Sequence, residues 1–552
     1  MADNEPSDRN QPEEDEDDGI DIEFQTVRAM RLKMFSDAVW SIVATIMIVP
    51  TMHLGITEEL HKTTKDMQEI VKEIIPQVFL YLLAFLIICS TWNCHVWTFQ
   101  TMKNVTDLSI VFNLILLLAA SFLPYFYSMM SRFQTWQTIV IYSSIQIFIG
   151  LIQCALVLHA FSYPGILRPA IDDLPHDEKM RIRRKILYKI AVAPAYCAIA
   201  MALSAASTTA AMVCLALILI HPWTQSLLCV TATQASKCAE MMDRNVRRLE
   251  RDILLTERVK KERIEAFSDG VFAITSTLLV LDISEKYLPS KKLMKTSFEN
   301  NPVNYFAVHW GVYVSYVQMF IIIGLLWYTQ LMLFKNFERF SRVMLFANNL
   351  ILACIGMIPL SFTFILHFKI QPAIRVGLQF ACITIFLVGL FSIVLYVFGF
   401  IFDRCKRKKS VNLYVNQPNA GRTRPDELVE IDEAALLLGS EHHETEDVAE
   451  GKQHRTKGKN EEVWMSKTIQ PGGKDFWMMI YQMLGICIGS SIVFGFTFMT
   501  DVFVSMYVGT GVLGLYTLIL VLWKSIAANV ADIRSYYEKL HSSNVTGNTE
   551  NK

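Results

Sequence analysis

Apolar runs of roughly 20 residues recur along this chain, and that length allows a helix to cross the ~30 Å hydrocarbon layer of a bilayer. Lipid offers no hydrogen-bond partners to a free backbone, so such a run folds as a helix whose bonds are internal. Over the whole sequence, 52% of residues are apolar and 19% are charged. These features predict an all-α membrane protein that spans the lipid bilayer many times.

We predict twelve spanning helices from these runs. They cover residues 34–53, 76–99, 104–130, 136–161, 188–207, 209–232, 267–284, 303–334, 342–367, 374–402, 476–499 and 502–526. The fifth and sixth arise from one apolar run, Ala191 to His221, which fits either one long helix or two helices joined by a turn near Ser207. Two helices are favoured because the repeat described next then has equal halves.

The first predicted helix occurs twice in the sequence. The stretches 31–50 and 263–282 align without a gap and agree at Arg, Phe, Ser, Asp, Val, Ile and Thr. The next two spans also match at one common offset: Phe85 to Trp92 over Phe320 to Trp327, Asn113 over Asn348, and Pro124 over Pro359. The repeat predicts two homologous six-helix halves. Because six is even, both halves have the same orientation and are related by an axis along the membrane normal.

The chain divides accordingly into five predicted parts. These are an acidic disordered tail (1–25), the first repeat (26–240), a basic cytosolic linker (241–262), the second repeat (263–530) with a disordered cytosolic insert (403–473), and a C-terminal tail (531–552). Lys and Arg gather after the fourth, sixth and tenth spans. Since such residues concentrate on the cytosolic side, we expect a multi-pass protein with both termini in the cytosol.

Several classes of function are disfavoured by composition. A net charge of −1 gives no basis for binding nucleic acid, and the 11 cysteines lie mostly in apolar runs or basic loops, which implies no disulfide framework. The sequence has no Walker loop, zinc spacing or nucleophile elbow, so we expect neither an enzyme nor a cofactor. A run of Arg at every third position and a Thr-Val-Gly-Tyr-Gly filter are absent too, which disfavours a voltage sensor and a carbonyl filter.

Each copy of the repeated helix opens with a polar motif at its predicted cytosolic end. The motif residues are Arg31, Phe35, Ser36 and Asp37 in the first copy and Arg263, Phe267, Ser268 and Asp269 in the second. Polar groups at this depth need partners. Arg31 and Asp37 could pair within one helix, but a network between helices is favoured, through Trp92, His95 and Asn113 in the first half and Trp327, Gln330 and Asn348 in the second. Ordinary capping with a snorkelling Arg would explain one copy but not two.

Beyond the motif, one stripe of each helix has a repeated composition. Ile42, Thr45, Ile46 and Val49 follow the spacing i, i+3, i+4 and i+7, and Ile274, Thr277, Leu278 and Leu281 repeat it. An Ile and Leu stripe usually packs in a core. The duplicated Thr favours a face that meets water instead, so these residues are predicted to line a pathway.

On the two Arg-x-x-x-Phe-Ser-Asp helices and the six-helix halves, the chain resembles the transmembrane protein 175 family of endolysosomal potassium channels, over nearly all twelve spans. The resemblance implies a homodimer in which four copies of the first helix, two from each chain, surround a pore without a carbonyl filter. It also implies a potassium-selective, leak-type channel of endosome and lysosome membranes that passes protons at lysosomal pH.

The resemblance further implies a role for two pairs of stripe residues. It places the pore constriction at Ile42 and Ile274 and pore threonines at Thr45 and Thr277, with potassium in the pore as the only metal ion. An apolar ring of this kind gates by dewetting, since a partly dehydrated ion finds no ligands in it. Potassium holds its water less tightly than sodium and is expected to cross more easily.

Two other functions fit parts of the pattern. Twelve spans in two parallel halves also describe secondary transporters of the major-facilitator type. Two observations speak against that alternative. Residues 99–103, between the second and third spans, lack the Gly-Asp-Arg pattern that such transporters carry in this loop. The repeated helices also have no charged residue at mid-membrane that could couple transport to a proton or sodium ion. A non-conducting scaffold that acts through its cytosolic insert is a third possibility.

Two short patterns predict where the protein resides. Asp432, Leu436 and Leu437 fit an acidic dileucine sorting signal, and Tyr537 to Leu540 fit a tyrosine-based one. Sorting adaptors read such addresses in accessible cytosolic chain. We therefore expect these patterns to direct the protein to endosomes and lysosomes.

Overall fold

The computed structural model describes residues 14–54, 67–163, 165–220, 259–299, 301–337, 339–367, 371–415 and 474–499. Within these ranges helices joined by short turns and loops make up the protein, with one antiparallel pair of two-residue strands, β1 (Val259–Lys260) and β2 (Arg339–Phe340). Nine helices of the described chain are long and apolar enough to span a membrane. The protein is thus an all-α membrane protein.

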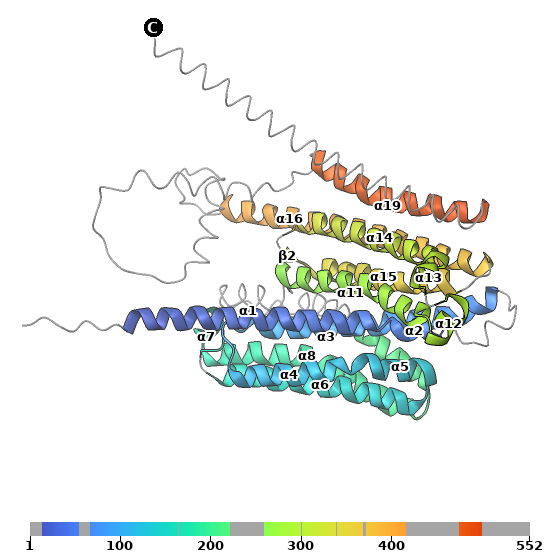
Figure 1. The fold of residues 1–552 in the computed structure, drawn as a ribbon. Coiled ribbons are helices and arrows are strands. Elements are labelled where there is room, and N and C mark those ends of the chain that lie inside the picture. The colour runs from blue at the N-terminus through green and yellow to red at the C-terminus, as the bar shows by residue number, and fades with distance from the viewer. Residues whose placement is uncertain are drawn as a thin grey trace, which may run out of the picture. The chain divides into compact units, whose positions relative to one another are not determined.

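The first half begins with the long helix α1, which packs against α3, α4 and α5 of the same half. In order, the helices are α1 (Glu14–Ile46), α2 (Val49–Leu54), α3 (Met67–Gln100), α4 (Asp107–Ser121), α5 (Leu123–Phe133), α6 (Trp136–Ser162), α7 (Pro169–Asp172) and α8 (His176–Ser204). Helix α6 packs against both α4 and α8, and the three lie on one side of α1 and α3 (Figure 1). A core of buried apolar side chains from α3, α6, α7 and α8, including Phe99, Leu156 and Ile186, holds this side together.

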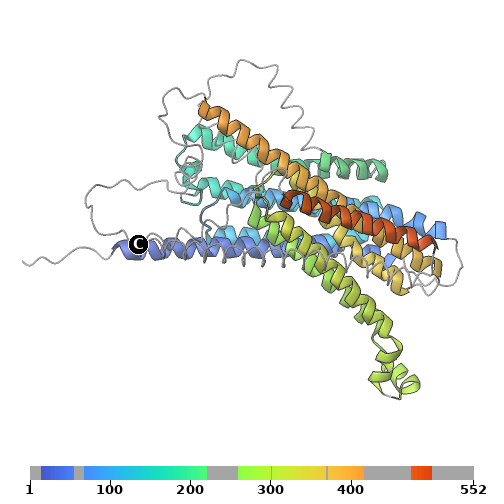
Figure 2. The same ribbon diagram turned by 90° about the horizontal axis from the view of Figure 1, so that it is seen from above.

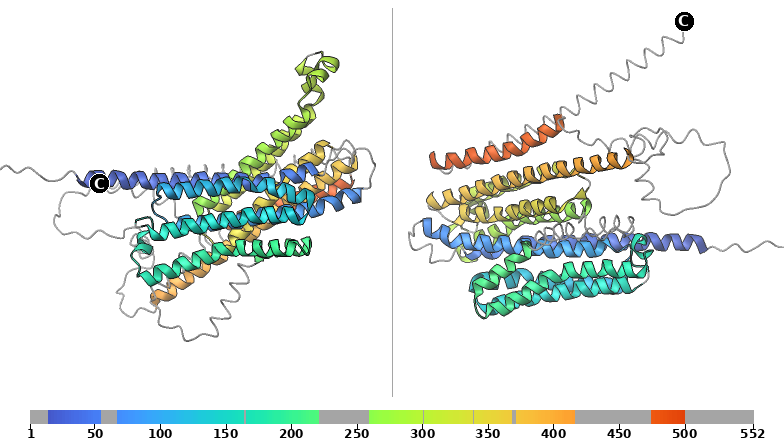
Figure 3. Two further views of the ribbon diagram at one scale, coloured as in Figure 1. Left: turned by 90° about the horizontal axis from the view of Figure 1, so that it is seen from below. Right: turned by 180° about the vertical axis from the view of Figure 1, so that it is seen from behind.

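The second half follows in the chain. Its helices are α11 (Lys261–Tyr287), α12 (Lys291–Ser297), α13 (Pro302–Val308), α14 (Trp310–Phe334), α15 (Arg342–His367), α16 (Gln371–Val415) and α19 (Lys474–Met499). Helix α11 packs against α1, α14 and α15. Helix α14 leans away from the other helices, with α12 and α13 at its start (Figures 2 and 3). Tyr396–Ile480 forms a separate compact unit, and the sites below lie in the remainder of the chain.

Some predicted spans are divided by breaks in the helix. The span 34–53 consists of α1 and α2, because Pro50 has no N–H and begins a helix more easily than it continues one. The span 104–130 breaks at Phe122, just before Pro124, and the span 303–334 breaks at His309. After α8 the chain turns at residues 205–207, and a separate helix runs over Thr208–Ile220.

Two segments predicted as disordered differ in part from the structure. Helix α1 starts at Glu14, within the tail 1–25, because acidic residues favour a helix N-terminus. Helix α16 continues to Val415, within the insert 403–473, since Lys and Arg are good helix formers. The last predicted span 502–526, most of the linker 241–262 and the sorting residues Asp432, Leu436, Leu437 and Tyr537 lie outside the described residues.

Candidate pore helices and their polar network

The two repeated helices, α1 and α11, lie side by side and approach closely. A Cβ atom built on Gly270 would stand 2.2 Å from Ser41 Oγ, so this packing needs a glycine in α11. Nearby, the rings of Trp92 and Phe267 stack at a centroid distance of 4.2 Å. The contact joins α11 to both α1 and α3 at the motif.

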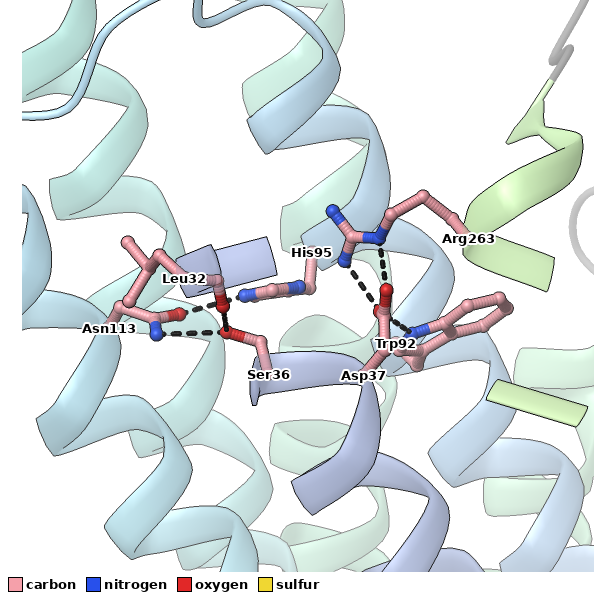
Figure 4. A network of polar contacts seen from close by, with 7 residues as sticks. All are labelled: Leu32, Ser36, Asp37, Trp92, His95, Asn113 and Arg263. Carbon is pink, nitrogen blue, oxygen red and sulfur yellow. Dashed lines mark hydrogen bonds and ion pairs between the residues drawn. The ribbon is translucent and has the colours of Figure 1, made fainter. Parts of the chain in front are cut away.

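A buried ion pair links the two motif copies (Figure 4). Arg263 Nη2 of α11 donates to Asp37 Oδ1 of α1 at 2.6 Å, and Arg263 Nε pairs with Asp37 Oδ2. Trp92 Nε1 of α3 also donates to Asp37 Oδ1, at 2.8 Å. Asp37 is fully buried and Arg263 is 8% exposed. The guanidinium hydrogen bond and the indole hydrogen bond both end on Asp37 Oδ1, and the Arg263 charge lies beside both carboxylate oxygens, which makes this buried charge tolerable.

Ser36 is the centre of a second set of hydrogen bonds in the first half (Figure 4). Asn113 Nδ2 of α4 donates to Ser36 Oγ at 3.0 Å, and Ser36 Oγ donates to the Leu32 carbonyl at 2.8 Å. His95 Nε2 lies 2.8 Å from Asn113 Oδ1. Because an amide oxygen only accepts, His95 Nε2 carries the proton in this arrangement.

The second half repeats these contacts. Trp327 Nε1 donates to Asp269 Oδ1 at 2.7 Å, Asn348 Nδ2 donates to Ser268 Oγ at 3.2 Å, and Gln330 Nε2 donates to Asn348 Oδ1 at 2.7 Å. Gln330 thus takes the place of His95. One contact differs, since Asp269 is exposed and no cation pairs with it among the residues that the structure describes.

The equivalence of His95 and Gln330 gives a testable expectation. His95→Gln retains a donor to Asn113 and should leave the melting temperature of the purified protein nearly unchanged. His95→Leu removes the donor, strands a buried amide oxygen and should cost about 1 to 3 kcal/mol. Thermal unfolding of both variants in detergent makes the comparison. Equal losses in the two variants would show that the hydrogen bond is not what His95 contributes.

The stripe residues have different surroundings in the two copies. Ile42 is 42% exposed and Leu281 is 60% exposed, Ile46, Val49 and Ile274 are half-buried, and Thr277 is exposed. Thr45 and Leu278 are buried within the single chain. Both threonines donate to the carbonyl of a preceding residue, Thr45 Oγ1 to Ser41 at 2.7 Å and Thr277 Oγ1 to Ile274 at 2.9 Å.

Two features of these helices differ from the expectations above. The partners of Asp37 were expected on the second and third spans or at Arg31, whereas its charged partner is the motif arginine of the other copy. The second feature is Asp282, a residue without a predicted role, which is 4% exposed near the far end of α11 and accepts a hydrogen bond from Thr363 Oγ1 at 3.3 Å. No group of His, Cys, Asp and Glu suited to a metal ion occurs in the described part of the chain.

Known proteins are similar in sequence to this chain over as much as 70% of its length. The profile of a family described as endosomal/lysosomal potassium channel TMEM175 matches residues 31–124 and 263–359. The endosomal/lysosomal proton channel TMEM175 of Homo sapiens is 30% identical over 384 residues, 69% of this chain and 74% of the relative. That of Gallus gallus is 29% identical over 391 residues, 70% and 76% of the two chains. A potassium channel of Streptomyces collinus is 36% identical over 97 residues, 18% and 43% of the two chains.

The multi-spanning helical fold, with motif helices that a channel family shares, defines an ion channel and not an enzyme. The chain belongs to the TMEM175 family of endosomal and lysosomal channels.

Proposed function

We propose that this protein is a potassium-selective leak channel of endosome and lysosome membranes that also conducts protons. The observation that carries the proposal is the buried Asp37–Arg263 pair, which fixes the two stripe-bearing helices side by side. Its relatives are named as potassium channels and as proton channels. In this proposal each chain has twelve spans in two six-helix halves, and both termini lie in the cytosol.

The narrowest part of the pore is a ring of isoleucines from Ile42 and Ile274. Two helices cannot enclose a pathway, so α1 and α11 supply two walls and a second copy supplies the other two. An apolar ring holds too little water for a hydrated ion when it is narrow and wets when the helices separate. The motif residues fix the helices that carry the ring and do not touch the ion. The other stripe residues, Thr45, Ile46, Val49, Thr277, Leu278 and Leu281, follow Ile42 and Ile274 along their helices and line the pathway on the C-terminal side of the ring.

Current recordings test this function directly. In whole lysosomes or planar bilayers with purified protein, the reversal potential should follow the potassium gradient when sodium is on the opposite side. Lowering the pH on one side should add a proton component to the current. Saturable uptake of an organic solute with fixed stoichiometry would favour the secondary transporter, and the absence of any current from a folded protein would favour a scaffold.

The location in endosomes and lysosomes is proposed to depend on the dileucine signal. Replacing Leu436 and Leu437 with Ala should move a tagged protein to the plasma membrane, because the adaptor no longer reads the address. Surface biotinylation and whole-cell potassium current measure the shift. Tyr537→Ala alone tests the tyrosine-based pattern in the same way. If a variant with all three residues, Leu436, Leu437 and Tyr537, replaced by Ala still resides in lysosomes, the sorting signal lies elsewhere in the chain.

A further inference from the structure

From the loop that joins α11 to α14, we infer that its two short helices, α12 and α13, lie in the headgroup layer of the membrane and bind anionic phospholipids. Lys291, Lys292 and Lys295 of α12 bind the lipid phosphates, and exposed apolar side chains of α13 and of the start of α14 enter the acyl layer. The lipid contact does not depend on the proposed function. Only the side of the membrane, which the proposed topology makes the luminal one, rests on that proposal.

The course of the chain places this loop at the membrane surface. The membrane-spanning part of α11 ends at Ser284, and the next span, α14, begins at Trp310. Consecutive spans leave and re-enter the membrane at one face, so the loop between them begins and ends at that face. Helices α12 and α13 project from the other helices at the start of α14 (Figures 2 and 3). The loop is therefore tethered at both ends within reach of lipid headgroups.

The lysines of α12 form one positively charged face. Lys291, Lys292 and Lys295 lie within about 100° of one another around the helix axis, and all three are exposed. Residues 288–310 contain one acid, Glu299, against these three lysines. Basic side chains that cluster at a membrane surface are attracted to anionic lipids. The charge of α12 therefore fits a leaflet that contains such lipids.

Exposed apolar side chains accompany the lysines. Val303 and Phe306 lie three residues apart on one face of α13 and are 70% and 55% exposed. Trp310, the first residue of α14, is 59% exposed. Tryptophan is favoured at the level of lipid headgroups, and lysines combined with exposed apolar residues are typical of helices that lie in this layer. The apolar side chains thus have a partner in the acyl chains beneath the headgroups.

Tyr305 gives the loop a defined shape. Its hydroxyl donates to the carbonyl of Tyr287, the last residue of α11, at 2.7 Å. Its ring stacks on His309 at a centroid distance of 4.3 Å and meets the edge of Phe298, just after α12, at 5.1 Å. The end of α11, both short helices and the start of α14 are thus joined around one buried ring. The lysines and the apolar side chains are presented to the membrane together.

Photoactivatable lipids test the inference. The full-length protein is reconstituted in phosphatidylcholine vesicles that contain a trace of phosphatidylglycerol or of phosphatidylcholine with a diazirine in the acyl chain. Mass spectrometry of the peptides then locates the attached lipid. Phosphatidylglycerol should label residues 288–310 about tenfold more than phosphatidylcholine, because each lysine near an anionic headgroup raises the affinity several-fold. The double variant K291Q/K295Q should bring the two lipids toward equal labelling.

A matched double variant controls for the loss of charge. Lys72 and Arg132 are exposed, and they lie near the start of α3 and the end of α5. These positions are at the same membrane face as the loop, since α1 and α11 begin at one face, where their motifs meet. K72Q/R132Q removes equal charge from this face and should keep the preference for phosphatidylglycerol.

The apolar side chains have a control of their own. F306S should lower the labelling of residues 288–310 by both lipids, because a hydroxyl in place of the ring holds the loop less deeply in the acyl layer. F133S changes an exposed phenylalanine at the end of α5 and should leave that labelling unchanged. If a variant fails to fold, the labelling of the unmodified protein decides alone.

Three results would overturn the inference. Labelling that spares residues 288–310 would mean that lipid does not reach the loop, as when a second protein covers it. Equal labelling of the unmodified protein by the two lipids would mean that the lysines do not select charge. An equal loss of preference in K291Q/K295Q and K72Q/R132Q would mean that total charge, and not α12, attracts the anionic lipid.

The proposed function is judged by separate measurements. An epitope inserted after Glu299 reports the side of the membrane, because an antibody reaches a cytosolic loop when only the plasma membrane is permeabilised. Access under that condition would overturn the proposed topology and leave the lipid contact in place. A preference for phosphatidylglycerol in a folded protein without potassium current would overturn the proposed channel and keep the lipid site.

Discussion

Replacing Ile42 with Asn is expected to raise the potassium current and let sodium pass. An amide side chain in the proposed constriction binds water, so the ring stays wet and an ion no longer loses its hydration there. The permeability ratio of potassium to sodium should fall toward parity, because only the dehydration step separates the two ions. Bi-ionic reversal potentials, with potassium on one side and sodium on the other, measure it.

The control for this experiment must put the same side chain in the membrane without touching the pore. Ile141 of α6 suits this purpose, because it is 38% exposed and Ile42 is 42% exposed. Ile141→Asn should leave selectivity unchanged, and Ile274→Ala should widen the same ring from α11. If Ile42→Asn and Ile141→Asn give the same reversal potential as the original protein, the constriction lies elsewhere.

Sequence reasoning could name Trp92, His95 and Asn113 as partners of the first motif because each is polar, lies near the same end of a predicted span and has a counterpart in the second half. It could not name Arg263 as the partner of Asp37. That pair depends on which helices of the two halves pack together, and neither periodicity nor spacing contains this information. The repeat only showed that both residue types occur twice.

The two prolines related by the repeat show that local sequence alone does not decide whether a helix breaks or continues. Pro124 follows a break between α4 and α5, whereas Pro359 lies inside the continuous helix α15. A proline removes one backbone hydrogen bond and crowds the preceding turn, and neighbouring helices decide whether the chain bends or breaks. The surroundings of α15 are denser, since residues 351–363 are all buried. The helix ends were therefore less predictable than the helices themselves.

Removing the carboxylate of the buried pair should lower the stability of the fold strongly and should change the preference between potassium and sodium little. Asp37→Ala leaves the Arg263 guanidinium buried without a counter-charge, a change that costs about 3 to 5 kcal/mol in buried pairs. The loss should appear as a lower melting temperature in detergent and a smaller yield of folded protein. Asp107→Ala is the matched control, because Asp107 of α4 pairs with Arg28 of α1 at the surface, where ion pairs contribute about 1 kcal/mol or less.

The double variant Asp37→Leu with Arg263→Met tests whether the loss of stability in Asp37→Ala comes from the unpaired charge. Both buried charges are then replaced by apolar groups of similar volume, so most of the stability lost in Asp37→Ala should return. Recovery in the double variant would show that the cost came from the stranded guanidinium and that α1 and α11 meet at these residues. An Asp37→Ala protein that melts like the original and differs only in its preference between potassium and sodium would mean that Asp37 faces the ions and does not hold the two helices together.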